Sequence, residues 1–368
     1  MNSSKIGTYE AIMLVLSLVV SHTVLSLPKA IVTTTKSSSI LNLIYLSIFV
    51  FVFVIIICNI FKKFPGMDIL DLAEYLGGKI FKRFLGIIFI LYFTISSAIF
   101  LRNFCECLQI VYYPSTSIVF IVFSFIISTC LVADLPSNAS FKANLIIVPF
   151  VLGSILFLFL ANLKYFNYNR IFPILGNGLF ETFGSGFTNI YAFSGIALIY
   201  FLPPLLKHPE KLKKISIIAF ILTSLYLVFV IALILLMFPI FTNIDEVLPL
   251  YTVATYVEFG TFLQRLESVF LLIWMISFSC YLSIILSFVF LFFKKITDIK
   301  YNKPMIYPFG MLLLALSLLP KTFAESKFYE TNIYPYVLIA VAYFIPGIIM
   351  SFAYIKKKKE GDINEYTN

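Results

Sequence analysis

Residues 40–63 read ILNLIYLSIFVFVFVIIICNIFKK, a run of uncharged and mostly apolar residues that ends at two lysines. A run of this length crosses the roughly 30 Å of bilayer hydrocarbon as an α-helix, because no water there can satisfy an open backbone. Lysines at the end of a span tend to remain in the cytoplasm. The stretch therefore predicts a membrane-spanning helix whose carboxyl end faces the cytoplasm.

Apolar runs of the same kind extend along the rest of the chain. Mean hydropathy is +1.00 and 12% of the residues are charged, which leaves little sequence for a soluble domain. We therefore expect an all-α polytopic membrane protein, a single transmembrane domain over residues 1–368 with a short basic tail at 356–368. The ten expected spans are about 8–33, 40–61, 81–110, 116–132, 141–160, 185–206, 215–238, 263–293, 304–319 and 332–355.

The positive charges alternate from loop to loop in step with these spans. With the amino terminus inside, nineteen of the 27 Lys and Arg residues lie in inner segments, six in outer segments and two within spans. This bias predicts that both termini are cytoplasmic. The net charge of +9 is therefore a signal of topology, and the sequence contains no soluble basic module that would bind nucleic acid.

The sequence also argues against several functional classes. The amino-terminal apolar run is too long for a signal peptide and has no A-x-A site. The five cysteines lie in apolar runs without metal-binding spacing, so we expect no metal site, disulfide or cofactor. No HExxH, GxSxG or GxxxxGK[ST] motif occurs, and every aspartate lies in a loop or the tail. We therefore expect no catalytic residues and no enzyme activity.

Three loops are expected to have structure of their own. Asp68 and Asp71 precede an apolar stripe that ends at Gly77-Gly78, which predicts a short helix on the inner surface. The outer segment 161–184 is rich in Asn, Gly, Pro and aromatic residues and predicts an ordered lid or turn. A second outer segment, 239–261, has the apolar spacing of a helix.

The first and sixth spans contain matching interruptions. One carries Ser21-His22-Thr23 near its middle, the other carries Ser194-Gly195, and each ends in a Leu-Pro pair. Matching breaks are typical of a five-plus-five inverted repeat, here about residues 8–160 and 185–355. The alternative is that the serine and threonine bond to their own helix and Gly195 merely allows close packing.

A break at mid-membrane exposes backbone groups, which are tolerated where they line a cavity or meet a ligand. Helix ends there suit a zwitterion, amino ends for a carboxylate and carboxyl ends for an ammonium. His22 contacts either the ligand or a proton, or else bonds a neighbouring helix, and the serine stripe that includes Ser279 lines a cavity or serves packing. The expected ligand-binding residues are Ser21, His22, Thr23, Tyr191, Phe193, Ser194, Gly195, Ser279 and Cys280.

Four ionisable residues are expected at one outer level of two spans. Arg102 and Glu106 lie one turn apart on the third span, and Arg265 and Glu267 open the eighth. A buried charge without a partner is costly, so Glu106 should pair with Arg102 in its own helix or with Arg265 across helices. The network serves function, or it clamps the helices as a structural cluster.

Several stretches carry a family resemblance. They are Leu27-Pro28 at the end of the first span, YYPST at 112–116, NRIFPILG at 169–176, YFLPP at 200–204, and LPLY at 248–251 with FLQRLESVF at 262–270 and Trp274. In these stretches the chain resembles the permease-like B subunits of spore germinant receptors, a branch of the amino acid–polyamine–organocation superfamily, over nearly its whole length. The resemblance implies a LeuT-like fold with broken helices 1 and 6. It also implies nutrient sensing at the spore inner membrane, together with A and C receptor subunits.

A sensor and a permease could hold a zwitterionic amino acid in the same way. No Asp or Glu is expected at membrane depth near the breaks and only His22 is close, which favours a sensor over a proton-coupled carrier. We therefore expect a subunit that binds a small nutrient, an amino acid by preference, and signals by conformational change within the lipid bilayer. The alternatives are a proton-coupled or exchanging amino-acid permease, and a structural subunit with a vestigial pocket.

Overall fold

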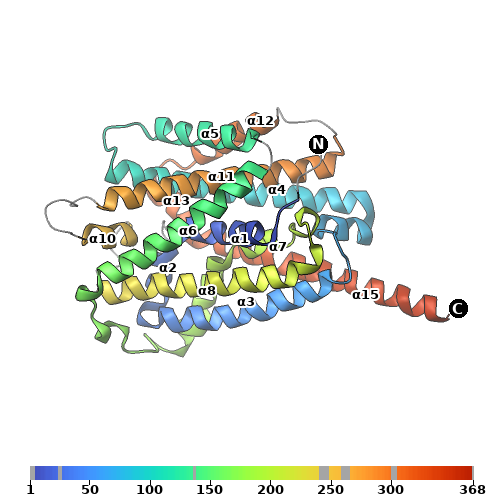
Figure 1. Ribbon diagram of the computed structural model, residues 1–368, viewed down its shortest axis with the longest axis horizontal. Coiled ribbons are helices and arrows are strands. Elements are labelled where there is room, and N and C mark those ends of the chain that lie inside the picture. The colour runs from blue at the N-terminus through green and yellow to red at the C-terminus, as the bar shows by residue number, and fades with distance from the viewer. Residues whose placement is uncertain are drawn as a thin grey trace.

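The computed structural model describes residues 5–23, 27–135, 138–239, 248–257, 266–299 and 305–366. Within these ranges the chain is helical and the β-pairing is one isolated bridge between Ile6 and Leu206. The long helices run side by side along the longest axis of the molecule (Figure 1). The α-helices are α1 (Thr8–Thr23), α2 (Leu27–Thr35), α3 (Ser39–Phe61), α4 (Ile69–Val111), α5 (Ile118–Asp134), α6 (Asn138–Ala161), α7 (Ile196–Ile199), α8 (Leu212–Met237), α10 (Pro249–Thr255), α11 (Leu266–Thr297), α12 (Ile306–Ser317), α13 (Phe323–Phe328), α14 (Tyr334–Leu338) and α15 (Ile345–Tyr366).

The expectation of a multi-pass membrane protein is confirmed. In the described part of the chain, six helical stretches are long and apolar enough to cross a bilayer: Leu27–Phe61, Ile69–Val111, Phe141–Ala161, Pro209–Met237, Leu266–Thr297 and Phe323–Glu360. Shorter apolar helices cover Thr8–Ser21, Ile118–Asp134 and Ile306–Ser317. Nine of the ten expected spans coincide with one or more of these helices.

The expected span at 185–206 differs because it is not one continuous α-helix. It consists of the 3₁₀ helix η5 (Ser185–Phe193), the four-residue α7 and the short turn η6 (Pro203–Leu205). Gly195 interrupts it in the middle and the two prolines end it, because glycine weakens a helix and proline removes a backbone donor. The segment packs between α1, α3 and α14.

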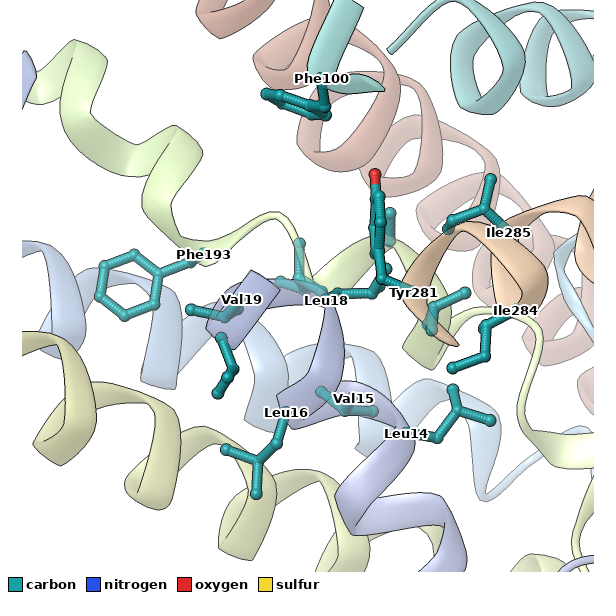
Figure 2. Close-up of a cluster of buried hydrophobic side chains, with 14 of the residues drawn as sticks. Leu14, Val15, Leu16, Leu18, Val19, Phe100, Phe193, Tyr281, Ile284 and Ile285 are labelled. Carbon is teal, nitrogen blue, oxygen red and sulfur yellow. The ribbon is translucent and has the colours of Figure 1, made fainter. Parts of the chain in front are cut away.

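Helix α1 lies at the centre of the molecule, where it packs against α6, α8 and α11. Figure 2 shows Leu14, Val15 and Leu18 of α1 beside Tyr281 and Ile284 of α11 in a cluster of buried hydrophobic side chains. Around this centre α3 packs on α8, and α4 packs on α11. Ser21 and Ser194, at the two breaks expected from the sequence, are 1% and 5% exposed, although α1 itself stays helical to Thr23.

The segments expected on the inner side meet one another at one end. Arg83 Nε donates to the carbonyl of Ile296 at 3.2 Å, and Lys356 Nζ donates to that of Tyr75 at 2.7 Å. Figure 1 marks both chain ends at this same end of the molecule. The short inner helix is also confirmed: Asp68 forms a capping box with Asp71, and α4 is non-helical at Gly77 and Gly78, where it bends before the span proper.

The segments expected on the outer side meet at the opposite end. Residues 161–184 form the ordered lid that was expected, with the short helices η2 (Leu163–Tyr165) and η3 (Tyr168–Ile171) and the π-helix η4 (Phe180–Gly184). Arg170 Nη1 donates to the carbonyl of Leu236 at 2.9 Å, and Asn42 Nδ2 donates to that of Thr182 at 2.7 Å. The helix expected within 239–261 is α10.

Candidate functional site

The carboxyl-terminal turn of α1 brings one expected site residue to a neighbouring helix. Ser21 is 1% exposed and its hydroxyl lies 3.5 Å from that of Ser277 on α11. Helix α1 ends at Thr23 and α2 begins at Leu27. The side chains of His22 and Thr23 lie outside the described residues, so the structure places only the backbone that carries them.

The segment at 191–195 comes close to α1 from the other side. A Cβ atom added to Gly195 would lie 2.9 Å from the carbonyl oxygen of Val15, so this glycine allows a contact between two backbones. Phe193 is buried and packs against Phe220 of α8, with ring centroids 5.4 Å apart. Phe193 thus points toward α8, whereas Gly195 contacts α1, as Figure 2 illustrates for Phe193.

Tyr191 and Ser194 belong to a cluster of buried aromatic and hydroxyl groups. The ring of Tyr191 meets that of Tyr334 edge to face at 6.2 Å, and the Tyr334 hydroxyl shares a hydrogen bond with Ser194. The same hydroxyl lies 3.4 Å from that of Tyr92 on α4, and these two rings are stacked. The tyrosine cluster of Tyr92, Tyr191 and Tyr334 therefore joins α4, η5 and α14.

Ser279 and Cys280 occupy other sides of α11. The hydroxyl of Ser279 donates to the carbonyl of Met275 on its own helix at 3.0 Å. Cys280 is buried, and like the other four cysteines it forms no disulfide. The face of α11 that turns toward α1 instead carries Ser277 and, one turn later, Tyr281, a pair that the sequence pattern of Ser279 did not single out.

The outer charge network is only partly described. Arg102 Nη2 and Glu106 Oε1 form the expected intrahelical ion pair at 2.7 Å, with side chains 6% and 12% exposed. Arg265 lies outside the described residues, so the cross-helix alternative stays a prediction. Glu267 lies half-buried in the first turn of α11.

A second buried carboxylate was missed by sequence reasoning. Glu330 is 3% exposed and accepts a hydrogen bond from Asn103 Nδ2 of α4 at 2.6 Å. It lies one helical turn before Tyr334, whose ring meets that of Tyr191 at 6.2 Å, so the stretch that packs on Tyr191 carries an acidic side chain. The last span was expected to begin at residue 332, which left Glu330 in a loop. In the structure the helical stretch begins at Phe323 and includes Glu330.

The inner end of the molecule carries a third group of charges. Lys295 Nζ lies 2.6 Å from Asp68 Oδ2 and 2.6 Å from Asp71 Oδ2, joining the start of α4 to the end of α11. Burial raises the pKa of Asp68 to about 6, although Lys295 opposes the shift. Burial also acts on Asp71, but hydrogen bonds from Lys295 and the backbone outweigh it and lower the pKa of Asp71.

The chain just before α1 and the end of the segment at 185–206 are tied together beside this cluster. The Ile6 amide donates to the carbonyl of Leu205 at 2.8 Å, and the Lys207 amide donates to the carbonyl of Ile6 at 3.0 Å. The Ile69 amide donates to the carbonyl of Tyr200 at 3.2 Å. A cavity of about 470 Å³ adjoins these contacts and is lined by Phe201, Phe288, Phe292, Lys82, Lys295 and Asp68, among others.

Comparison with known proteins gives one consistent answer. The family model described as spore germination protein matches residues 5–325 of this chain. Spore germination protein A2 of Bacillus subtilis (strain 168) is 23% identical over 367 residues, which is 96% of this chain and 97% of the relative. Spore germination proteins YndE and KB of the same organism are each 23% identical, over 331 residues (87% and 88% of the two chains) and 307 residues (82% of each).

Proposed function

Because the chain belongs to the spore germination protein family, we propose that it is the permease-like, nutrient-sensing B subunit of a spore germinant receptor. The proposal is supported by relatives that it matches over nearly their full length and whose names describe germination proteins. It is also supported by a chain made almost entirely of apolar helices, which leaves a membrane as its place of action. That membrane would be the spore inner membrane, and the partners would be A and C receptor subunits.

One observation carries the location of the ligand site. Buried hydroxyl groups from five separate parts of the chain form two groups in the core, one of Ser21 with Ser277 at the end of α1 and one of Tyr92, Ser194 and Tyr334. Polar side chains are costly at this depth, so such groups are typical of a site that holds something polar. The adjoining His22 and Thr23, with Tyr191, Phe193 and Gly195, complete the ligand site that we propose.

The ligand class follows from the helix ends at this site. The carboxyl end of α1 carries a partial negative charge and suits an ammonium group, whereas the amino end of α2 suits a carboxylate. Together they favour a small zwitterion such as an amino acid. We infer that the two interrupted segments correspond to helices 1 and 6 of a five-plus-five inverted repeat.

Signalling requires that the ligand bind one of two arrangements more tightly. The inner contacts between Ile6 and the chain at 205–207, and between Asp68, Asp71 and Lys295, hold one such arrangement closed at the inner end. A ligand that changes how α1 packs against segment 191–195 would weaken these hydrogen bonds and ion pairs. The receptor would thus transmit occupancy of the site to its cytoplasmic surface.

A proton-coupled or exchanging permease is the second candidate, and Glu330 is the observation that favours it. The expectation of a sensor depended partly on the lack of an acidic residue near the breaks, and this carboxylate is buried one helical turn before Tyr334, which packs on Tyr191. Buried acids of this kind serve as proton relays in carriers. Whether transport occurs is therefore the decisive question.

Uptake and germination measured side by side separate the two functions. We expect spores that lack this chain to lose germination with one nutrient, while the purified protein in proteoliposomes binds that nutrient without accumulating it. Accumulation driven by a proton gradient, together with normal germination of the deletion strain, would establish the permease instead. Loss of germination with no binding would point to the structural subunit.

A further inference from the structure

Asn103 and Glu330 form a buried pair in which one acceptor, Asn103 Oδ1, has no hydrogen-bond partner in the part of the chain that the structure describes. Asn103 is 1% exposed and Glu330 is 3% exposed, and the amide nitrogen of Asn103 donates to Glu330 Oε2 at 2.6 Å. Within the described residues this is the one hydrogen bond of the carboxylate, and Asn103 Oδ1 has no hydrogen-bond partner. A carboxylate accepts several hydrogen bonds, so most of the accepting capacity of the pair is unused.

Two cations that lie near this pair in the chain, Arg102 and Lys327, have contacts with other groups. Arg102, next to Asn103 in the chain, forms its ion pair with Glu106 at 2.7 Å. Lys327, one turn before Glu330, holds its ammonium over the ring of Phe323 at 5.5 Å. An amide is a weak substitute for a cation, because burying an ionised carboxylate away from water is strongly unfavourable.

We propose that Glu330 and Asn103 form a binding subsite for a primary ammonium group. An ammonium has three donors and no acceptor, which complements two free carboxylate positions and one orphaned amide oxygen. It also supplies the positive charge that the carboxylate lacks, in a charge-assisted hydrogen bond. A water molecule would offer only two donors and no charge.

The surroundings are chemically suited to a cation. Tyr334 lies one turn after Glu330 on the same helical stretch, and its ring meets those of Tyr191 at 6.2 Å and Phe100 at 4.9 Å. Aromatic faces attract an ammonium that approaches them. Ser194 is bonded to Tyr334, so the subsite is connected to the proposed ligand site through a single side chain.

This inference deepens the proposed function, on which it rests: the ammonium is the α-ammonium of the nutrient, to which the carboxyl end of α1 also turns its partial negative charge. It adds a carboxylate to the proposed site, which otherwise holds only uncharged hydroxyl and aromatic groups beside His22. The nutrient would then draw α4 and the stretch at 323–360 together around its charge. A subsite of this kind selects amino compounds against the corresponding hydroxy acids, which lack the positive charge.

The test uses the full-length protein in detergent and methylammonium chloride as the minimal probe. We expect methylammonium to raise the thermal unfolding temperature of the wild-type protein, and tetramethylammonium, which has no N–H donor, to have no such effect. Equal effects of both salts would overturn the proposal, and this comparison requires no variant. In Glu330→Gln the methylammonium effect should disappear, while the matched control Glu325→Gln, which removes an outer carboxylate of the same helical stretch, should retain it.

A second experiment keeps failure of the subsite apart from failure of the proposed function. The twenty common L-amino acids are tested singly for binding, and the one that binds is compared with its 2-hydroxy acid. We expect Glu330→Gln to lower the binding affinity for the amino acid at least tenfold and the affinity for the hydroxy acid by less than twofold. Equal affinities of the wild-type protein and Glu330→Gln for the amino acid would contradict the subsite, but the proposal of nutrient sensing would stand. If no amino acid binds, the proposed ligand class fails, and methylammonium alone still decides the subsite.

Discussion

At the scale of single residues, Asp68 and Asp71 lie at the same distance from Lys295, but their pKa values shift in opposite directions. Both carboxylates lie 2.6 Å from Lys295, but Asp68 is 5% exposed and its pKa is raised to about 6, whereas the pKa of Asp71 is lowered. The folded protein therefore binds a proton at Asp68 more tightly than the unfolded chain does. Between pH 3.8 and about 6, the contribution of Asp68 to stability decreases as the pH rises, while the contribution of Asp71 is lost only as the pH falls through its lowered pKa.

We predict that Asp68→Asn and Asp71→Asn affect the unfolding temperature differently at pH 7.5: Asp71→Asn lowers it and Asp68→Asn does not. Asparagine caps a helix as well as aspartate does, so Asp68→Asn keeps the capping bonds and removes a buried charge. Its unfolding temperature should be unchanged or higher, and the pH dependence between 4 and 6 should flatten. Asp71→Asn removes the stronger partner of Lys295 and should cost about 1 kcal/mol. Thermal unfolding across pH 4–8 checks both, and a greater loss for Asp68→Asn at pH 7.5 would contradict the assignment.

The ion pair of Arg102 with Glu106 gives a prediction about the outer level. Glu106→Gln keeps the shape of the side chain but leaves a guanidinium that is 6% exposed without its anion, which should cost about 3–5 kcal/mol. The double variant Arg102→Glu with Glu106→Arg preserves the pair within the helix and should recover much of that loss. Membrane levels and unfolding temperatures measure both effects. A double variant no better than Glu106→Gln would show that the partner of Glu106 lies on another helix.

At the scale of elements, local patterns predicted local structure, and tertiary contacts supplied the rest. The capping box at Asp68 and Asp71 and the bend at Gly77 and Gly78 follow from residues within one turn of one another, so spacing was sufficient. Glu330 was missed because its burial depends on Asn103, which is 227 positions away in the chain. The span at 185–206 has an apolar composition, but composition does not reveal that a glycine and two prolines divide it into short helices.

The contact between Gly195 and α1 gives a prediction about these elements. Gly195→Ala places a Cβ atom 2.9 Å from the carbonyl oxygen of Val15, so the segment must move away from α1. We expect a lower unfolding temperature and a weaker nutrient response. The matched control is Gly153→Ala on α6, where a Cβ atom meets nothing within 4 Å and alanine stabilises the helix by up to about 1 kcal/mol. Equal unfolding temperatures and nutrient responses of the two variants would mean that the close contact at Gly195 is not required for stability or function.

At the scale of the whole molecule, the charge pattern and the fold agree without sharing any assumption. The positive-inside rule assigned nineteen cations to one side from the sequence, and the structure brings several of those segments together. Arg83 bonds Ile296, Lys356 bonds Tyr75, and Lys295 bonds Asp68, contacts that join loops more than 200 positions apart in the chain. The rule could not say which loops would touch, because that depends on which helices pack side by side.

This agreement predicts the orientation of the protein in the membrane. Lys358, an exposed residue at the end that carries both termini, should be cytoplasmic, and Tyr168 of the outer lid, 65% exposed, should lie on the opposite side. The native cysteines are buried, so they should react little with a thiol reagent. In intact cells, a membrane-impermeant maleimide should label Tyr168→Cys at once and Lys358→Cys only after permeabilisation. The reverse pattern would place nineteen cations on the outer side, against the inner-membrane potential as well as the positive-inside rule, and would overturn both the topology and the cytoplasmic relay that the proposed receptor needs.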